Sequence, residues 1–266
     1  MADKCTIKLY QIYYNEETKS KIDPLYIPLD NSNSPKPEWF EFYPIKCFLD
    51  QNELEDNTYY GFLSPRFYEK TGMAAEQLIA LIQEKSKEGI DVFISSLGFG
   101  SIAYYQNLFE QGENWHPGLK SLSQQAFNKM GLSIDLDSLV SSVHTSVYCN
   151  YLIGNKRYWQ EWKLIANKFY DLVEHDNSEL GKALRANTNY LRGNTAMRTF
   201  IQERLPSVIL SSNKYLTCSF GLERNPNLLE YAKLEMCNYF KTRYNHTNDP
   251  IDLMVYKHIR GTVSLE

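Results

Sequence analysis

Cysteines are few in this chain of 266 residues, and their spacing is irregular. There are five, an odd number, and no pair forms a CxxC motif. Scattered cysteines of this kind argue against a disulfide framework and against a zinc site, and they are typical of proteins in a reducing compartment. The start of the sequence also lacks the basic and apolar blocks of a secretion signal. We therefore expect a cytoplasmic protein.

Long apolar runs and blocks of basic residues are missing as well. No run approaches the ~20 apolar residues that a membrane-spanning helix needs. Lysine and arginine never stand more than two in a row, and 28 basic against 32 acidic side chains give a net charge of −4. Because nucleic-acid binding depends on a basic footprint, we expect no nucleic-acid partner, no transmembrane segment and at most peripheral membrane contact. A local basic pocket for one anionic ligand remains open.

The common catalytic signatures are absent too. The sequence has no GxxxxGK[ST], GxGxxG, HExxH or GxSxG motif, which disfavours P-loop enzymes, zinc proteases and α/β-hydrolases. Asp135 and Asp137 spell DxD, a spacing that can hold Mg²⁺ or Mn²⁺. They follow a Gly-Leu-Ser segment instead of a strand, and their pattern is closer to that of a helix cap. The pattern therefore allows a divalent metal, but we do not expect one as a cofactor.

What the sequence does contain predicts an α/β protein. Apolar residues make up 43% of the chain, enough for one large core. Residues 6–14, 59–63, 90–97 and 146–153 are rich in β-formers and predict strands, with 6–14 and 90–97 as neighbouring inner strands. We expect a mixed twisted sheet flanked by helices. Residues 1–175 would form the α/β core, and residues 176–266 a helical C-terminal part packed on the same body.

Helices are predicted from apolar periodicity and from capping patterns. The clearest begins near Tyr158, with apolar residues at intervals of three and four up to Leu172. Others are expected over 73–87, 102–110, 119–130 and 195–211, the last with a kink at Pro206. Asn225-Pro226 and Asp249-Pro250 predict the starts of two closing helices. The proline-rich residues 15–57 indicate a long loop region.

Three polar clusters are candidates for a site. The first lies at the C-terminal end of the first strand, where ligands of α/β sheets bind: Gln11, Tyr13, Tyr14 and Asn15. The second follows residues 59–63 and contains Ser64 and Arg66, whose guanidinium suits a phosphate, with Lys70 nearby. A glycine turn at residues 98–100 could also receive an anion, but a plain strand-to-helix turn is the simpler interpretation.

The third cluster lies between two predicted helices, in residues 107–118. It combines a carboxylate, amides, an indole and an imidazole, which together suit hydroxyl recognition and acid–base chemistry. Glu110 and His116 are the candidate acid–base groups. Asn107, Gln111 and Trp115 are the candidate groups for binding a sugar or acceptor. The alternative is a capped turn between helices, with Glu110 closing a helix and His116 packing beside Trp115.

Several segments together resemble a known group of proteins. They are YQIYYNEET, DPLYIPLDN, YYGFLSPRFYEKTG, DVFIS, NLFEQGENWHPGL, CNYLIGNKRYWQEW and FIQERLPSVIL. In this order they resemble bacterial glycosyltransferase-like proteins of surface-polysaccharide gene clusters, similar in layout to small GT-A-type transferases. The resemblance extends from about Lys8 to about Leu210.

The resemblance implies a nucleotide-sugar donor, a glycan or lipid-linked acceptor and a cytoplasmic site. It places the nucleotide near residues 13–15 and 64–66, and the transferred sugar near Glu110 and His116. One departure is that Ser95-Ser96 stand where such an enzyme carries its metal-binding acidic pair. Transfer without a metal needs cations or N–H groups at the leaving diphosphate, and Arg66, Lys70 and a cationic His116 are the candidates.

Two other functions remain open. A non-catalytic nucleotide- or glycan-binding protein on the same fold is favoured by the missing acidic pair. A phosphotransferase or nucleotidyltransferase ranks last, because no acidic pair stands at a predicted strand end.

Overall fold

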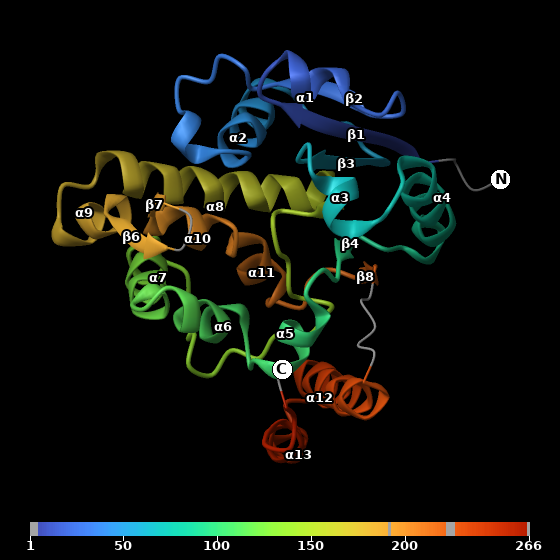
Figure 1. The fold of residues 1–266 in the computed structure, drawn as a ribbon, viewed down its shortest axis with the longest axis vertical. Coiled ribbons are helices and arrows are strands. Elements are labelled where there is room, and N and C mark those ends of the chain that lie inside the picture. Colours follow the sequence, from blue (N-terminus) through green and yellow to red (C-terminus); the bar gives the residue numbers. More distant parts are fainter. Residues whose placement is uncertain (1–4, 191–192, 222–226, 265–266) are drawn as a thin grey trace.

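The centre of the protein is a six-stranded mixed sheet. The computed structural model describes residues 5–190, 193–221 and 227–264. The strand order is β2-β1-β3-β5-β4-β8, and β5 runs antiparallel to both of its neighbours while the other pairs are parallel. The strands are β1 (Thr6–Tyr13), β2 (Ile27–Asp30), β3 (Thr58–Leu63), β4 (Val92–Ser95), β5 (Leu152–Asn155) and β8 (Thr217–Phe220). The predicted fold class, a mixed sheet flanked by helices, is confirmed (Figure 1).

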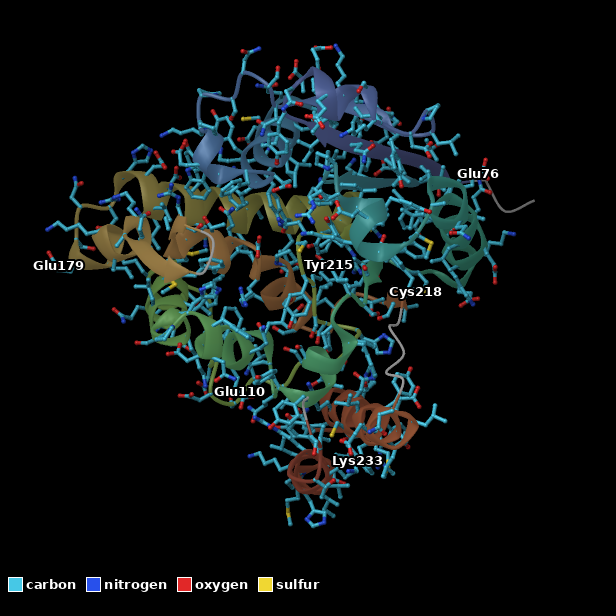
Figure 2. The ribbon with its side chains drawn as sticks, in the orientation of Figure 1. Glu76, Glu110, Glu179, Tyr215, Cys218 and Lys233 are labelled. Carbon is cyan, nitrogen blue, oxygen red and sulfur yellow. The ribbon has the colours of Figure 1, made fainter. Side chains whose placement is uncertain are left out.

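Helices cover both faces of this sheet. Helices α2 (Phe42–Gln51) and α8 (Lys156–His175) lie on one face, and α3 (Phe67–Thr71) and α4 (Ala75–Lys85) lie on the other. Strand β3 shows why: Tyr60 and Phe62 belong to the core on the α8 side, whereas Tyr59 and Leu63 belong to the opposite core. Side chains fill the space between these layers (Figure 2).

Helix α8 is the best-predicted element. Asn155 caps it by accepting a hydrogen bond from the Tyr158 N–H at 3.1 Å. The predicted apolar positions are all buried: Tyr158, Trp162, Ile165, Phe169 and Leu172. Burial of each such side chain contributes about 1.5–3 kcal/mol. The neighbouring Trp159 donates its Nε1–H to the Tyr60 carbonyl of β3 at 2.8 Å, which fixes the helix on the sheet.

The chain beyond residue 175 is mostly helical, but it also completes the sheet. Its edge strand β8 pairs in parallel with β4. The other elements are α9 (Glu179–Arg185), β6 (Asn187–Tyr190), β7 (Gly193–Ala196), α10 (Met197–Gln202), α11 (Leu205–Leu210), α12 (Leu228–Thr247) and α13 (Pro250–Arg260). Strands β6 and β7 pair only with each other within the described residues.

Helices α12 and α13 lie at the end of the molecule opposite α2 and β2 (Figure 1). They pack on α5 (Phe99–Tyr104) through a core of their own. The Asp249 side chain caps α13 at Pro250, as predicted. The predicted cap at Asn225-Pro226 lies outside the described residues, and α12 is capped by Asn227.

Two predictions about strands are wrong. Strands β1 and β4 are inner strands but not neighbours, because β3 pairs with β1 and β5 inserts between β3 and β4. Of residues 146–153, only the last two form a strand, since β5 begins at Leu152. Cys149 and Asn150 both have φ of 56°, in the left-handed region, and such a backbone cannot continue a strand.

Residues 15–57 are not a long loop. They hold α1 (Glu16–Ser20), β2, the 3₁₀ turn η1 (Pro37–Trp39) and α2. Their prolines occupy positions that spare a backbone hydrogen bond: Pro28 lies on an edge strand, Pro37 begins a 3₁₀ turn, and Pro44 is in the first turn of α2. Proline therefore marks the starts and edges of elements in this segment.

Three predicted helices have different boundaries. Residues 102–110 divide into α5 and α6 (Leu108–Trp115), because Asn107 caps a new helix. Residues 195–211 contain the end of β7, α10 and α11, with Pro206 in the first turn of α11 instead of at a kink. Residues 73–87 form α4 followed by a 3₁₀ turn, η2 (Ser86–Glu88). Helix α7 (Leu119–Lys129) matches its prediction closely.

Asp135 does not cap a helix. Its Oδ1 accepts the Asp137 N–H at 3.0 Å within a turn, and Asp137 forms an ion pair with Lys120 at 2.5 Å.

Gly98 precedes α5 with φ of 75°, so the glycine segment is a strand-to-helix turn. Within the described residues, no helix combines the length and the apolar character needed to cross a bilayer.

Candidate functional site

The carboxyl ends of five strands meet at one edge of the sheet. Strands β2, β1, β3, β4 and β8 run in the same direction, and antiparallel β5 starts from that same edge. Open α/β sheets bind ligands outside the carboxyl ends of their strands. We call this region the carboxyl edge and define it by Gln11, Tyr14, Glu41, Ser64, Lys70, Ser96, Glu203 and residues 148–151.

Hydrogen bonds connect these strand ends. Gln11 on β1 donates its Nε2–H to the Ser64 carbonyl after β3 at 3.4 Å. The Ser64 hydroxyl lies 2.6 Å from the Tyr151 hydroxyl, and the Ser95 N–H on β4 donates to the Tyr151 carbonyl at 3.0 Å. The segment before β5 is therefore fixed to both β3 and β4.

Residues 148–151 form a tight turn with unusual backbone geometry. The Tyr151 N–H donates to the Tyr148 carbonyl at 3.1 Å, and the two residues between them both have positive φ. A turn of this geometry favours glycine, asparagine or aspartate at its central positions, so Asn150 suits it and Cys149 does not. Backbone strain of the kind at Cys149 costs of order 1–3 kcal/mol and tends to persist at functional sites.

Lys70 reaches this turn from the end of α3. Its Nζ donates to the Cys149 Sγ at 3.4 Å and lies 5.6 Å from the centre of the Tyr151 ring. Burial is the largest influence on the Cys149 thiol, and it raises its pKa. The thiol is therefore protonated near neutral pH, which argues against a thiolate nucleophile.

Four buried polar atoms at this edge have no hydrogen-bond partner among the described residues. They are Gln11 Oε1, Ser96 Oγ, Tyr148 OH and Asn150 Oδ1. Leaving such an atom unsatisfied costs about 1–3 kcal/mol, so each needs an explanation. Such atoms also occur elsewhere among the described residues, but these four lie where strand ends meet, which is where open α/β sheets bind the polar groups of a ligand.

Glu203, at the end of α10, brings a carboxylate to the same place. Burial raises its pKa, Arg204 and Lys70 oppose that shift, and the nearby Glu41 adds to it. Burial and Glu41 also raise the pKa of the Tyr14 hydroxyl. A carboxylate whose pKa is raised is a stronger base than an ordinary glutamate.

Arg204 follows Glu203 in the chain, and its positive charge lowers the pKa of the Glu203 carboxyl from inside the protein. The arginine is 6% exposed. Its guanidinium donates to the Leu108 carbonyl at 2.9 Å, to the Phe200 carbonyl at 2.7 Å and to Gln111 Oε1 at 3.0 Å. These bonds join α6 to the junction of α10 and α11. The predicted acceptor-binding residue Gln111 thus uses its side-chain oxygen to hold Arg204.

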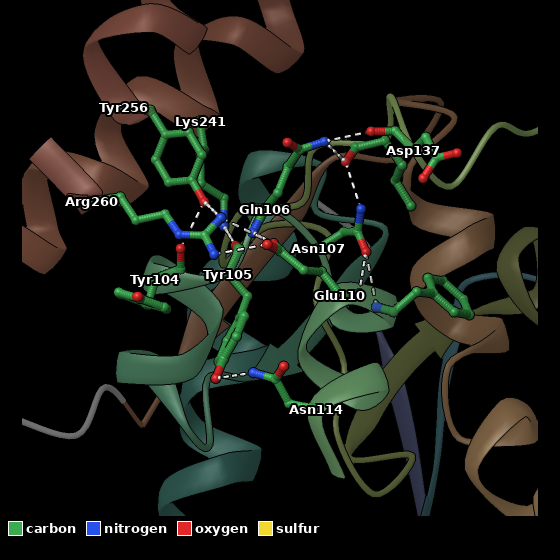
Figure 3. A network of polar contacts seen from close by, with 12 residues as sticks. Tyr104, Tyr105, Gln106, Asn107, Glu110, Asn114, Asp137, Lys241, Tyr256 and Arg260 are labelled. Atoms are coloured by element: carbon green, nitrogen blue, oxygen red, sulfur yellow. Dashed lines mark hydrogen bonds and ion pairs between the residues drawn. The ribbon is translucent and has the colours of Figure 1, made fainter. Parts of the chain in front are cut away.

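Glu110 faces away from the carboxyl edge. Its carboxylate pairs with Arg260 of α13 at 2.8 Å and accepts the Gln106 N–H at 2.5 Å (Figure 3). In the same network Lys241 of α12 donates to the carbonyls of Ile102 and Tyr105, both at 2.5 Å. These contacts attach the closing helices to α5 and α6.

The other predicted residues of this cluster also make structural contacts. His116 is 6% exposed and stacks on Phe200 with ring centres 3.5 Å apart. Burial, with Arg204 as the second cause, lowers its pKa to about 4, so the imidazole is neutral near pH 7 and cannot act as the expected cation. The Asn107 side chain holds the Leu136 and Leu139 carbonyls, and Trp115 is exposed beside a solvent-facing turn.

Most of the predicted donor-binding residues gather at the carboxyl edge, but three have other contacts. Gln11, Tyr14, Ser64 and Lys70 belong to the edge. Arg66 is exposed and paired with Glu69 through two hydrogen bonds of 2.9 and 2.6 Å, although Cys149 and Tyr151 are near enough to affect its pKa.

Tyr13 and Asn15 fix the first elements of the chain. The Tyr13 hydroxyl bonds to Asp30 at the end of β2. The Asn15 side chain caps α1 by accepting the Thr18 N–H at 2.8 Å.

A metal site is not evident among the residues that the structure describes. No three His, Cys, Asp or Glu side chains come together there. The DxD carboxylates make the turn and ion-pair contacts given above, and Ser95 and Ser96 stand at the end of β4. We assign no chemical step to a metal.

Sequence reasoning missed Glu203, Glu41 and the turn at residues 148–151. Within the helix predicted over 195–211, Glu203 and Arg204 have the pattern of an ordinary pair of opposite charges. Their position at a break between two helices, just before Leu205-Pro206, was the signal that could have singled them out.

The chain matches no protein-family model, no curated protein and no solved structure. The geometry and the resemblance of the sequence therefore carry the functional proposal.

Proposed function

We propose that the protein is a glycosyltransferase that moves a sugar from a nucleotide-activated donor to a glycan or lipid-linked acceptor. The resemblance of the sequence supplies the reaction class. The observation that supports a reaction at the carboxyl edge is Glu203, whose pKa is raised by burial. It shares the edge with four buried polar atoms that have no partner within the described residues.

In this proposal Glu203 is the general base. The acceptor hydroxyl oxygen bonds to the anomeric carbon, the bond from that carbon to the diphosphate breaks, and the hydroxyl proton passes to the Glu203 carboxylate. Lys70 would offset the charge of the leaving diphosphate. Arg66 would contribute as well, once its guanidinium exchanges Glu69 for a phosphate oxygen. The amide oxygens of Gln11 and Asn150 would accept hydrogen bonds from sugar hydroxyls.

Glu203 replaces Glu110 and His116 as the favoured acid–base group. The Glu110 carboxylate is held by Arg260 and Gln106. His116 stacks on Phe200 inside the protein. The earlier assignment stays a prediction, and the kinetic test below separates Glu203 from Glu110.

The test begins with a thermal-stability screen against nucleotides and nucleotide sugars. A donor present at a hundred times its dissociation constant should stabilise the protein by about 2.7 kcal/mol. With that donor and an acceptor, Glu203→Gln should lower turnover by roughly 10²–10⁴-fold, with donor affinity retained. Glu110→Gln is the control, because it changes a carboxylate outside the edge.

Two results would contradict the assignment. One is normal turnover in Glu203→Gln. The other is a loss of turnover in Glu110→Gln as large as that expected for Glu203→Gln, with its fold intact. Turnover of the parent protein should survive EDTA.

The second candidate is a non-catalytic nucleotide- or glycan-binding protein on the same fold. Ser95 and Ser96, in place of an acidic pair at the end of β4, favour it. A protein of this kind would be stabilised by a ligand of the same panel but would neither transfer nor hydrolyse its sugar.

A further inference from the structure

A cavity lies between β2 and α2, beside the edge strand of the sheet. Its volume is about 480 Å³, within the roughly 300–1,000 Å³ typical of small-molecule sites. We call it the α2 cavity. Its lining includes Asp30, Asn31, Asn33, Phe48, Gln51 and Asn52.

The lining mixes polar and apolar groups and carries little charge. It contains four carboxamide side chains, a tyrosine and a serine, with no lysine, arginine or histidine. A phosphate or carboxylate ligand would find no cation in this lining. Asp30 is the one acidic residue that lines it. Its Oδ1 already accepts the Ser32 N–H at 2.8 Å and the Ser32 hydroxyl at 2.7 Å. The lining therefore favours an uncharged ligand.

The carboxamides retain unused hydrogen-bonding capacity. Asn31 donates its Nδ2–H inward to the Phe40 carbonyl at 3.4 Å, and Asn52 donates to the Phe48 carbonyl at 2.8 Å. Both Oδ1 atoms, and the whole Gln51 amide, have no partner in the part of the chain that the structure describes. An amide oxygen accepts hydrogen bonds and an amide N–H donates them. These groups therefore suit neighbouring sugar hydroxyls, which both donate and accept.

An aromatic wall completes the cavity. The Phe48 ring is held by Tyr10 and Phe62, with ring centres 4.7 and 5.1 Å away. Aromatic rings offer an apolar face of the kind that the C–H side of a sugar covers. Because packing already fixes the ring, ligand binding does not carry the free-energy cost of ordering this side chain.

We infer that the α2 cavity binds an uncharged oligosaccharide. Carboxamides, hydroxyls and an aromatic face in one cavity without cations fit a polyhydroxylated neutral ligand better than a phosphate or a carboxylate. This inference does not depend on sugar transfer, since the cavity would hold a glycan whether or not the carboxyl edge is catalytic.

The test is a calorimetric titration of the full chain, without any nucleotide sugar. The probes are maltotriose, cellotriose and chitotriose. At least one should bind at millimolar concentration. Gln51→Ala should weaken that binding about tenfold, or ~1.4 kcal/mol, and Asn33→Ala should weaken it in the same direction. Both side chains are exposed, so the fold should survive.

Gln83→Ala on α4 is the matched control, because Gln83 is exposed on the opposite face of the sheet. It should bind the probe as the parent does, and so should Glu203→Gln, which separates this inference from the proposed base. The inference is overturned if no probe binds, if Gln51→Ala binds as tightly as the parent, or if a sulfated form of the bound sugar binds more tightly than the neutral one.

Discussion

Buried polar side chains in this protein fall into two groups. Arg204, Lys241 and Asn107 satisfy their hydrogen-bonding groups with backbone carbonyls and hold helices together. Gln11 and Asn150 keep an acceptor atom without a partner within the described residues. The first group stabilises the fold. The second contributes to binding if the carboxyl edge receives a ligand.

Asn150→Gly tests that division. Glycine adopts φ of 56° without strain, and the change removes a buried oxygen that has no partner. We expect the free energy of unfolding to rise by on the order of 1 kcal/mol, while affinity for the nucleotide sugar found in the screen falls. Chemical denaturation and calorimetry would measure the two effects.

Asn57→Gly is the control for Asn150→Gly, since Asn57 is exposed and also has positive φ, 52°. It should change stability by less than about 0.5 kcal/mol and leave binding unchanged. If Asn150→Gly destabilised the protein with no effect on binding, the amide would be structural.

His116 predicts how stability depends on pH. Its pKa is lowered to about 4 in the folded protein, from 6.5, because burial and the adjacent Arg204 disfavour the charged imidazole. Between pH 6.5 and 4 the unfolded chain therefore binds more protons, so this residue lowers stability as the pH falls through that window. Each tenfold difference in proton affinity is worth about 1.4 kcal/mol.

Melting temperatures measured from pH 7 to 4 should show the effect. The parent protein should lose stability more steeply than His116→Asn, which cannot titrate there. Parallel curves for the two proteins would show that the His116 imidazole is not shielded from solvent.

At the scale of elements, local patterns predicted some parts well and others poorly. Helix α8 has an apolar face along its whole length and a cap, and β1 has consecutive β-formers, so local sequence was sufficient for both. Residues 146–151 also look like a strand, but Cys149 and Asn150 turn the chain there. Ser64, Ser95 and Lys70 fix the turn from distant elements, and no local pattern reports such contacts.

The candidate site divides in the same way. Gln11, Ser64 and Lys70 could be predicted because they lie at or just after strand ends, and strand ends meet at one edge. Glu41 and Glu203 could not, because they come from helices that are far apart in the sequence. Glu110 was favoured for its polar neighbours, yet its partner Arg260 lies 150 positions away.

Two glycines in helices should respond in opposite ways to alanine. A Cβ on Gly112 of α6 would lie 2.7 Å from Arg204 Nη2 and 2.9 Å from Leu119 Cδ2. Gly112→Ala should therefore lower the free energy of unfolding by about 1–3 kcal/mol. It should also displace Arg204, whose charge acts on Glu203.

Gly100→Ala in α5 is the matched change. Its nearest neighbour beyond the helix would be Leu234 Cδ1 at 3.9 Å, an ordinary contact. Stability should stay equal or rise by up to ~1 kcal/mol, because alanine favours helix. Equal losses in both variants, measured by urea denaturation, would show that the contact with Arg204 does not decide the result.

At the scale of the whole molecule, residues on both sides of position 175 share one sheet. Strand β8 pairs with β4, and Lys241 and Arg260 bind groups of α5 and α6. We expect one cooperative unfolding transition, with equal calorimetric and van't Hoff enthalpies. Two separated transitions would contradict this, and would show that 176–266 unfolds independently of the first 175 residues.

The late arrival of β8 has a consequence for synthesis on the ribosome. Strand β4 ends at Ser95, but its outer partner begins at Thr217 and its inner partner β5 at Leu152. Until β5 is made, both edges of a strand of wholly buried residues are open to pairing with another chain, and the outer edge stays open until β8 is made. Newly made protein should therefore depend on chaperones until residue 220 has emerged, even where the finished fold is stable.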